Sequence, residues 1–254
     1  MSHGAALLTP IDRVITRSEV PSKSPDAIGY FSGIAEEFHA GYDLPEFQDR
    51  LRVWRGVLER HAPRGGLALD MGCGTGVFSF QLAKLGSRVV GVDGGDEMVA
   101  FCERQRIENN VENVRFFQGR LPHIDETGLS GADLVVSSSV VEYVDDLDGT
   151  LALFARLLRP GGTLVISMPN ATSLSRTYQR LKYRLKQHSD VYGLIKHYSS
   201  PRRLSKRLRR HGLTLLETHY YAHGTRLAQM AHKLRLSPRL TEDLFVAVFR
   251  KDGR

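Results

Sequence analysis

The feature that most constrains this chain is a run of three glycines at alternate positions, in residues 72–76. An apolar stretch that ends on Asp70 precedes the run, and a helical pattern of apolar residues, 77–85, follows at once. The pattern predicts a strand, a tight loop and a helix, in that order. Glycine is needed where the backbone takes a positive φ or lies against a ligand, so this loop is predicted to bind a ligand through its main chain.

Two phosphate-binding motifs are disfavoured by the residues of this loop. The dinucleotide fingerprint G-x-G-x-x-G needs glycine at position 77, where the chain has Val77. The phosphate loop, G-x-x-x-x-G-K followed by Ser or Thr, has no match here. A structural turn in some other α/β domain remains an alternative. It is weakened by a second acid, Asp93, at the end of the next predicted strand, 88–93.

An acidic strand end followed by G-x-G-x-G resembles motif I of the class I S-adenosylmethionine (SAM) methyltransferases. The resemblance implies a Rossmann-like α/β fold, a doubly wound and mostly parallel sheet of seven strands, with SAM as the cofactor. It also implies that the loop passes under the methionine part of SAM and that Asp93 binds the ribose hydroxyls. A carboxylate can accept hydrogen bonds from both hydroxyls of a cis-diol. The joint Arg-Pro-Gly-Gly-Thr-Leu, 159–164, is a further mark of the family.

On this resemblance, the SAM-binding residues are expected at the carboxyl edge of the sheet, where doubly wound folds bind ligands. They are Asp70, Gly72, Cys73, Gly74, Asp93, Gly94, Met98, Gly119, Arg120, Leu121 and Ser138. Met98 is expected either to pack on the adenine ring or to fill the core, since Met suits irregular apolar gaps anywhere. Many relatives have an acidic or small polar residue at Arg120, so a contact through its main chain alone is expected. Arg50 and Arg52 are weaker candidates for the carboxylate of the cofactor.

The exit of the fourth predicted strand, 133–137, is where the acceptor is expected. Ubiquinone-type O-methyltransferases, which the sequence resembles from motif I through the basic insertion, have Glu-x-x-Glu-His here, a pattern able to hold a divalent metal. This chain has Ser-Val-Val-Glu-Tyr at 139–143, so two of three ligands are missing and no metal is predicted. Three residues are predicted to be catalytic: Glu142 as a proton acceptor, Tyr143 to orient an oxygen, and His197 at the substrate mouth. A purely structural role is the alternative for each.

The resemblance therefore implies a transferase that methylates a small molecule, most directly a hydroxylated aromatic or quinone-like compound on oxygen. Methyl transfer from a sulfonium needs positioning, exclusion of water and removal of a proton, but no fixed triad. Residues 137–140 lack the Asp/Asn-Pro-Pro-Tyr/Phe run of nucleic-acid amine methyltransferases. An RNA or protein methyltransferase that docks through a basic segment and a non-catalytic SAM-binding protein are the alternatives.

One domain is expected, residues 26–254, after a mobile N-terminal segment, 1–25, that lacks a sustained hydrophobic period. Residues 26–61 contain two helical patterns that are predicted to form a cap. The aromatic residues Tyr30, Phe31 and Tyr42 are expected either to close over cofactor and substrate or to anchor these helices to the core.

Positive charge is concentrated in one part of the chain. The net charge of the 254 residues is +7, yet residues 171–212 contain 12 Lys and Arg against one acid, Asp190. A basic helical insertion, 171–200, is predicted after the fifth strand. The cationic surface of residues 174–210 is expected to bind an anionic membrane surface or to be solvated. Nucleic acid is disfavoured, because Tyr178 and Tyr183 lie on opposite sides of the predicted helix and form no stacking platform.

Two cysteines, Cys73 and Cys102, indicate neither a disulfide framework nor a cysteine metal site. The sequence has no signal-peptide pattern and no apolar stretch long enough to span a bilayer. A cytoplasmic protein is therefore expected, free or peripherally attached to the inner face of a membrane. The sequence predicts no oligomeric state.

Overall fold

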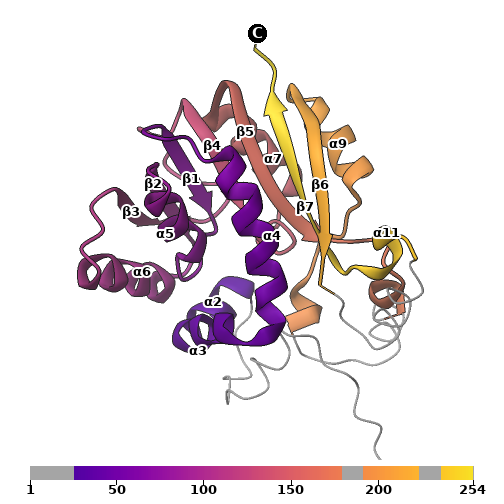
Figure 1. The fold of residues 1–254 in the computed structure, drawn as a ribbon, viewed down its shortest axis with the longest axis horizontal. Helices are drawn as coiled ribbons and strands as arrows, with labels where there is room; N and C mark the ends of the chain where they lie inside the picture. Colours follow the sequence, from indigo (N-terminus) through magenta and orange to yellow (C-terminus); the bar gives the residue numbers. More distant parts are fainter. Residues whose placement is uncertain (1–25, 179–190, 223–235, 254) are drawn as a thin grey trace, which may run out of the picture.

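The computed structural model describes residues 26–178, 191–222 and 236–253, except for the side chains of residues 45, 46, 191 and 192. Seven strands form one sheet in the order β3-β2-β1-β4-β5-β7-β6 (Figure 1). The strands are β1 (Leu67–Met71), β2 (Arg88–Asp93), β3 (Val114–Gln118), β4 (Ala132–Ser137), β5 (Leu158–Pro169), β6 (Leu213–Tyr221) and β7 (Leu244–Lys251). Strands β1 to β5 are parallel, and β7 is antiparallel to both of its neighbours. The predicted doubly wound sheet is confirmed.

Four helices connect or flank these strands: α5 (Val77–Lys84), α6 (Asp96–Glu108), α7 (Leu147–Leu157) and α9 (Pro201–Arg209). Helix α7 begins a turn before the apolar pattern, because the Asp146 side chain accepts a hydrogen bond from the Gly149 amide and caps it. Ser200 caps α9 in the same way, by accepting a hydrogen bond from the Arg203 amide. Two short helices, η2 (Val191–Leu194) and α11 (Pro238–Thr241), complete this part.

The N-terminal helices lie at the carboxyl edge of the parallel strands and cross one face of the sheet (Figure 1). They are α2 (Ala27–Ser32), α3 (Ala35–Ala40), η1 (Gly41–Asp43) and α4 (Pro45–His61). The sequence pattern over 26–38 suggests one helix, but the structure has two, because Ile34 leaves the helical conformation with φ −130° and ψ 27°. On α4, the predicted apolar face is buried: Phe47, Leu51, Trp54 and Leu58.

The sheet has a separate hydrophobic core on each face. On one face, apolar side chains of α7 and α9 pack against β1, β4, β5 and β7. On the other face, α4 and α5 supply the core, and Trp54 stacks on Phe78 with ring centroids 4.8 Å apart. Because both faces are covered, the carboxyl edge of the sheet is the place left for a ligand.

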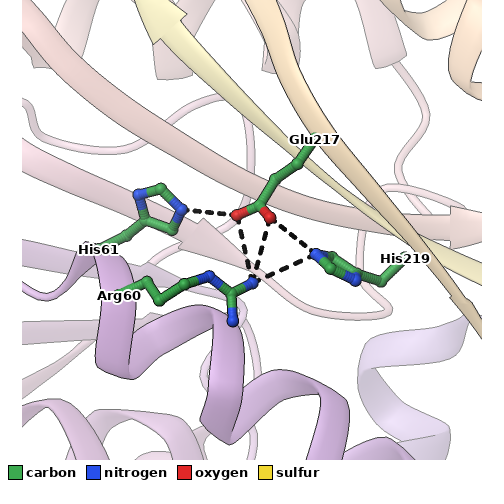
Figure 2. Close-up of polar contacts among 4 residues, drawn as sticks. All are labelled: Arg60, His61, Glu217 and His219. Carbon is green, nitrogen blue, oxygen red and sulfur yellow. Dashed lines mark hydrogen bonds and ion pairs between the residues drawn. The ribbon is translucent and has the colours of Figure 1, made fainter.

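A polar cluster joins the last turn of α4 to the edge strand β6 (Figure 2). Its centre is Glu217, whose Oε1 lies 2.7 Å from Nε2 of His61 and whose Oε2 lies 2.8 Å from Nε2 of His219. The Arg60 guanidinium donates to Glu217 at 3.1 Å. Burial works against ionisation here, but the hydrogen bonds from His61 and His219 lower the pKa of Glu217 to about 2. We call these four residues the Glu217 cluster.

Two predicted segments lie wholly or partly outside the described residues: the mobile segment 1–25, and the basic helical insertion 171–200, of which residues 179–190 are not described. Within the described part, no helix combines the length and the apolar character that crossing a bilayer requires.

Candidate active site

A pocket opens between the carboxyl ends of β1, β2 and β4 and the N-terminal helices. The glycine loop after β1 forms its floor. Gly72 has φ +79°, and a side chain there would overlap Val140. Gly74 has φ +54°, and a Cβ there would meet only the Phe38 ring, at 3.9 Å. Only Gly74 therefore leaves its main chain open to a ligand, whereas Gly72 is needed for the close approach of the β4 exit.

Asp93, at the end of β2, lines the pocket and is held by the same loop. Its Oδ2 accepts a hydrogen bond from the Gly74 amide at 2.8 Å, and its Oδ1 accepts one from the Gly95 amide at 2.9 Å. Burial raises the pKa of Asp93, and these backbone hydrogen bonds offset the rise only in part. The carboxylate is thus fixed in place, with room for further donors.

Asp70, the acid of the first strand, has a different place. It is buried below the loop and is not among the described residues that line the pocket. Its Oδ2 accepts a hydrogen bond from the Ser79 hydroxyl, on α5, at 2.6 Å. Burial raises the pKa of Asp70 to about 6, with the Ser79 hydrogen bond acting against the rise. Asp70 therefore joins the strand to the helix beneath the loop.

The other SAM-binding residues predicted from the sequence all line this pocket: Cys73, Gly94, Met98, Gly119, Arg120, Leu121 and Ser138. Met98 is almost fully buried. Arg120 reaches across the rim, and its Nη2 lies 3.1 Å from Asp26 and 3.5 Å from Asp145. Lys196 pairs with the same Asp145 at 2.5 Å. These ion pairs connect the start of α2 to the loops after β3 and β4.

Arg50 and Arg52 are equal candidates for the cofactor carboxylate in the sequence, but in the structure only Arg50 of the two lines the pocket. Arg50 is buried and lines the pocket, and its Nη2 donates to the Ser138 hydroxyl at 2.8 Å. Burial opposes the charge of Arg50, but Tyr42, Tyr221 and Glu142 raise its pKa. Arg52 is exposed and pairs with Asp49. The helical register contains the missed signal, since Arg50 follows Phe47 by three residues and precedes Trp54 by four, on the buried face.

The predicted catalytic residues occupy three different positions. Tyr143 lines the pocket and packs edge-on against Phe31, with ring centroids 5.5 Å apart. Glu142 is buried behind this wall, its Oε2 has no hydrogen-bond partner among the described residues, and burial raises its pKa to about 7. Nε2 of His197 lies 2.9 Å from the Val144 carbonyl, and His197 is not among the described residues of the lining.

Aromatic side chains form the wall of the pocket on the side of the cap. Phe31, Phe38 and Tyr42 all line it, and successive ring centroids in this row lie 5.6 Å apart. Tyr30 packs against Phe31 from outside the described lining. Among the residues that the structure describes, no three His, Cys, Asp or Glu side chains gather as metal ligands. The pocket thus combines an apolar aromatic wall with the charged groups of Asp93 and Arg50.

A family model described as a methyltransferase domain matches residues 64–221, which include the glycine loop, Asp93 and the exit of β4. The chain belongs to this methyltransferase family. Among curated proteins, the human mitochondrial ubiquinone biosynthesis O-methyltransferase is 32% identical over 151 residues, 56% of this chain and 40% of the relative. The enzyme of the same description from Hahella chejuensis is 31% identical over 112 residues, 44% of this chain and 47% of the relative. The chain thus spans less than half the length of these two relatives.

Solved structures agree on the fold. The magnesium protoporphyrin IX methyltransferase of Synechocystis, with bound S-adenosylhomocysteine (SAH), matches 96% of this chain and 93% of its own at a TM-score of 0.61 and 15% identity. A putative sarcosine dimethylglycine methyltransferase from Galdieria sulphuraria matches 86% of this chain and 88% of its own at 0.57 and 16%. At identities this low, the similarity shows a shared fold and nothing about activity.

The matched domain, residues 64–221, is a methyltransferase domain with the class I fold, and its cofactor is SAM. The described residues fit that cofactor in two respects. The open main chain at Gly74 admits close approach of a ligand, and the charges of the half-buried Asp93 and the buried Arg50 match the diol and the carboxylate that SAM carries. Bound SAM supplies a methyl group on a positively charged sulfur, already a strong electrophile.

Proposed function

We propose that this enzyme transfers the methyl group of SAM to a hydroxyl oxygen of a small aromatic or quinone-like acceptor. The observation that carries the proposal is the row of aromatic side chains along the pocket, which ends at Tyr143 beside the β4 exit. Flat rings pack edge-on or offset against such a wall. The ubiquinone biosynthesis O-methyltransferases to which the chain is similar support the same class of acceptor.

For the cofactor, we propose that Asp93 accepts the ribose hydroxyls and that Arg50 binds the carboxylate of the methionine part. Asp93 is held by two amides of the glycine loop and retains lone pairs for further donors. Arg50 uses one nitrogen on Ser138, while its Nε has no hydrogen-bond partner among the described residues. A buried guanidinium with donors to spare favours a carboxylate ligand.

For the chemistry, we propose a direct displacement. The acceptor oxygen forms a bond to the methyl carbon, the bond from carbon to sulfur breaks with its electron pair left on sulfur, and the acceptor proton leaves. Tyr143 orients the acceptor, and Glu142 takes the proton. A pKa near 7 suits a general base at neutral pH. His197 keeps its proposed role at the substrate mouth through its contact with Val144.

Tritiated methyl transfer tests this proposal. The purified enzyme is incubated with methyl-labelled SAM and a small-molecule extract of the native cell, and in parallel with total RNA and with protein. Label in the organic phase, lost on substitution of Asp93, is expected, with the rate unchanged by a chelator. Label confined to RNA or protein would establish the alternative methyltransferases, and SAM binding without any label would establish a non-catalytic protein.

We also propose that the protein binds an anionic membrane surface through residues 174–210. Helix α9 buries Leu204 and Leu208 while six cationic side chains around them are exposed, and Leu174 and Tyr178 are exposed as well. Each Lys or Arg near an anionic surface contributes about 1 kcal/mol. Residues 179–190 of this segment lie outside the described part.

Vesicle flotation measures this binding. Replacing Arg203, Lys206 and Arg210 by Gln is expected to release the protein from vesicles that contain phosphatidylglycerol, with SAM affinity unchanged. Replacing the exposed residues Arg64, Lys84 and Arg88 by Gln removes the same charge elsewhere and is expected to leave binding within twofold. Equal losses in both variants would mean that net charge alone attracts the protein.

A further inference from the structure

Ser139, the second residue after β4, has a backbone conformation that side chains rarely adopt. Its φ is +57°, in the left-handed region. Among the described residues, two other non-glycine residues have a positive φ, Asn110 and Ala222, and neither lines the active-site pocket. Ser139 does line it. Backbone strain of this kind persists only where the surroundings impose it, and it gathers at functional sites.

A chain of buried hydrogen bonds imposes this conformation. The Ser139 amide donates to the Ser167 hydroxyl, on β5, at 2.9 Å. Ser167 in turn hydrogen-bonds the phenol of Tyr221, on β6, which also accepts from Nε1 of Trp54, on α4, at 3.2 Å. Residues of two strands and one helix therefore fix the Ser139 backbone, and their hydrogen bonds offset the free-energy cost of its strained conformation.

The two serine hydroxyls that follow β4, those of Ser138 and Ser139, differ in their hydrogen bonding within the described part of the chain. The neighbouring hydroxyl, of Ser138, accepts a hydrogen bond from Arg50. The Ser139 Oγ is buried and has no hydrogen-bond partner among the described residues. A buried hydroxyl without a partner costs free energy, so its retention in a strained residue that lines the pocket favours a partner outside the protein, which the hydroxyl meets by rotating to another χ1 rotamer.

The position of Ser139 identifies the part of the ligand that it meets. Its neighbour Val140 lies directly over Gly72 of the cofactor loop, and Tyr143, at the end of the aromatic wall, donates its amide to the Val140 carbonyl at 2.9 Å. Ser139 thus stands where the cofactor side of the pocket meets the acceptor side. At that boundary the methyl group of the cofactor faces the acceptor oxygen to which it is transferred.

We propose that the hydroxyl of Ser139 holds the acceptor oxygen in line with the methyl group, as a positioning residue. The inference rests on the proposed function, since it needs an acceptor that reacts through a hydroxyl. A serine hydroxyl both donates and accepts, so it can bind the neutral hydroxyl before the reaction and the more negative oxygen during it. Ser139 keeps its own proton throughout, and the acceptor proton leaves to Glu142 as described above.

The substitution Ser139→Gly tests the role, because glycine removes the hydroxyl and also fits the left-handed backbone. The probe is catechol, with methyl-labelled SAM. We expect kcat/KM for catechol to fall about tenfold or more, through a lower kcat as well as a higher KM, with SAH affinity by calorimetry unchanged. Relief of strain is expected to raise the thermal midpoint by about 2 °C. A variant that is more stable and yet binds its acceptor less well is not explained by a structural role.

Asn110→Gly is the matched control, since it relieves a similar φ of +51° on the surface, outside the active-site pocket. It is expected to leave both kinetic constants within twofold. Unchanged kcat/KM in Ser139→Gly would overturn the inference while leaving the proposed function intact. Failure of the unsubstituted enzyme to methylate any hydroxylated aromatic, with transfer to another acceptor class, would overturn the proposed function and this inference with it.

Discussion

Two carboxylates of this protein, Asp93 in the pocket and Glu217 in the Glu217 cluster, both accept hydrogen bonds, yet their pKa values are shifted in opposite directions. Asp93 accepts from two backbone amides, and burial raises its pKa. Burial acts to raise the pKa of Glu217 as well, but hydrogen bonds from two imidazoles and the charge of a guanidinium lower it to about 2. The two pKa values differ because Asp93 accepts from neutral amides, whereas the donors to Glu217 include the charged guanidinium of Arg60.

This contrast distinguishes the carboxylate that we propose binds the cofactor, Asp93, from one with a structural role, Glu217. Glu217 already has the Arg60 guanidinium and two imidazoles as partners inside the protein, so a ligand has little to add to it. Asp93 is half-buried and is fixed by neutral amides, so any donor that a ligand brings stabilises its carboxylate further. Strongly perturbed groups in a cleft indicate function more often than equally perturbed groups within an ion-pair network.

The largest expected effect comes from removing each carboxylate in turn. Asp93→Ala is expected to weaken SAH binding by at least 100-fold, because two ribose hydroxyls lose a charged acceptor. Glu217→Ala is the matched control and is expected to leave the affinity within twofold. Isothermal calorimetry measures both, with circular dichroism to confirm folding. Similar affinities in the two variants would remove Asp93 from the cofactor site.

The same contrast applies to the two arginines on α4, Arg50 beside the pocket and Arg60 in the Glu217 cluster. Arg50→Gln is expected to weaken SAH binding about 10- to 50-fold, through the loss of one charge-assisted contact. Arg60→Gln is expected to leave binding unchanged, since its guanidinium reaches only Glu217 and His219 within the described part. Adenosine, which has the ribose but no carboxylate, provides the second measurement. Its affinity should be equal in wild type and Arg50→Gln, and a loss there would point to misfolding of the pocket.

The sequence predicts the pocket better than it predicts what surrounds it. The glycine loop and the strand that ends on Asp93 follow from local patterns, because φ demands and strand ends are set by neighbours in the chain. The doubly wound arrangement of the sheet is expected only from the family resemblance. The burial of Arg50 and the link from Ser139 to Trp54 depend on which face of α4 meets the sheet. Such contacts join residues far apart in sequence, and no local pattern encodes them.

The rim of the pocket illustrates the same limit. Arg120 is expected from the sequence to contribute its main chain, yet its side chain reaches Asp26, 94 positions earlier, and Asp145. Glu217 likewise has its partners His61 and Arg60 more than 150 positions away. Charged side chains on loops and strand edges look solvated in the sequence, and only the folded arrangement pairs them.

The smallest effect, and the one that depends most directly on the contrast, is the pH dependence of Glu217. Its folded pKa, about 2, lies below the ordinary glutamate value of 4.5, so it contributes stability above pH 4.5 that is lost as the pH falls toward 2. Because the cluster is partly exposed, we expect Glu217→Gln to lower the unfolding free energy at pH 6 by only about 1 kcal/mol. Urea unfolding from pH 6 down to pH 3 measures the difference in unfolding free energy between the wild type and Glu217→Gln. This difference should decrease steadily over the acid part of that range and should be smaller in 1 M salt. A difference that stayed constant with pH would assign the stabilisation to packing of the side chain, and the contrast with Asp93 would then no longer be one of charge.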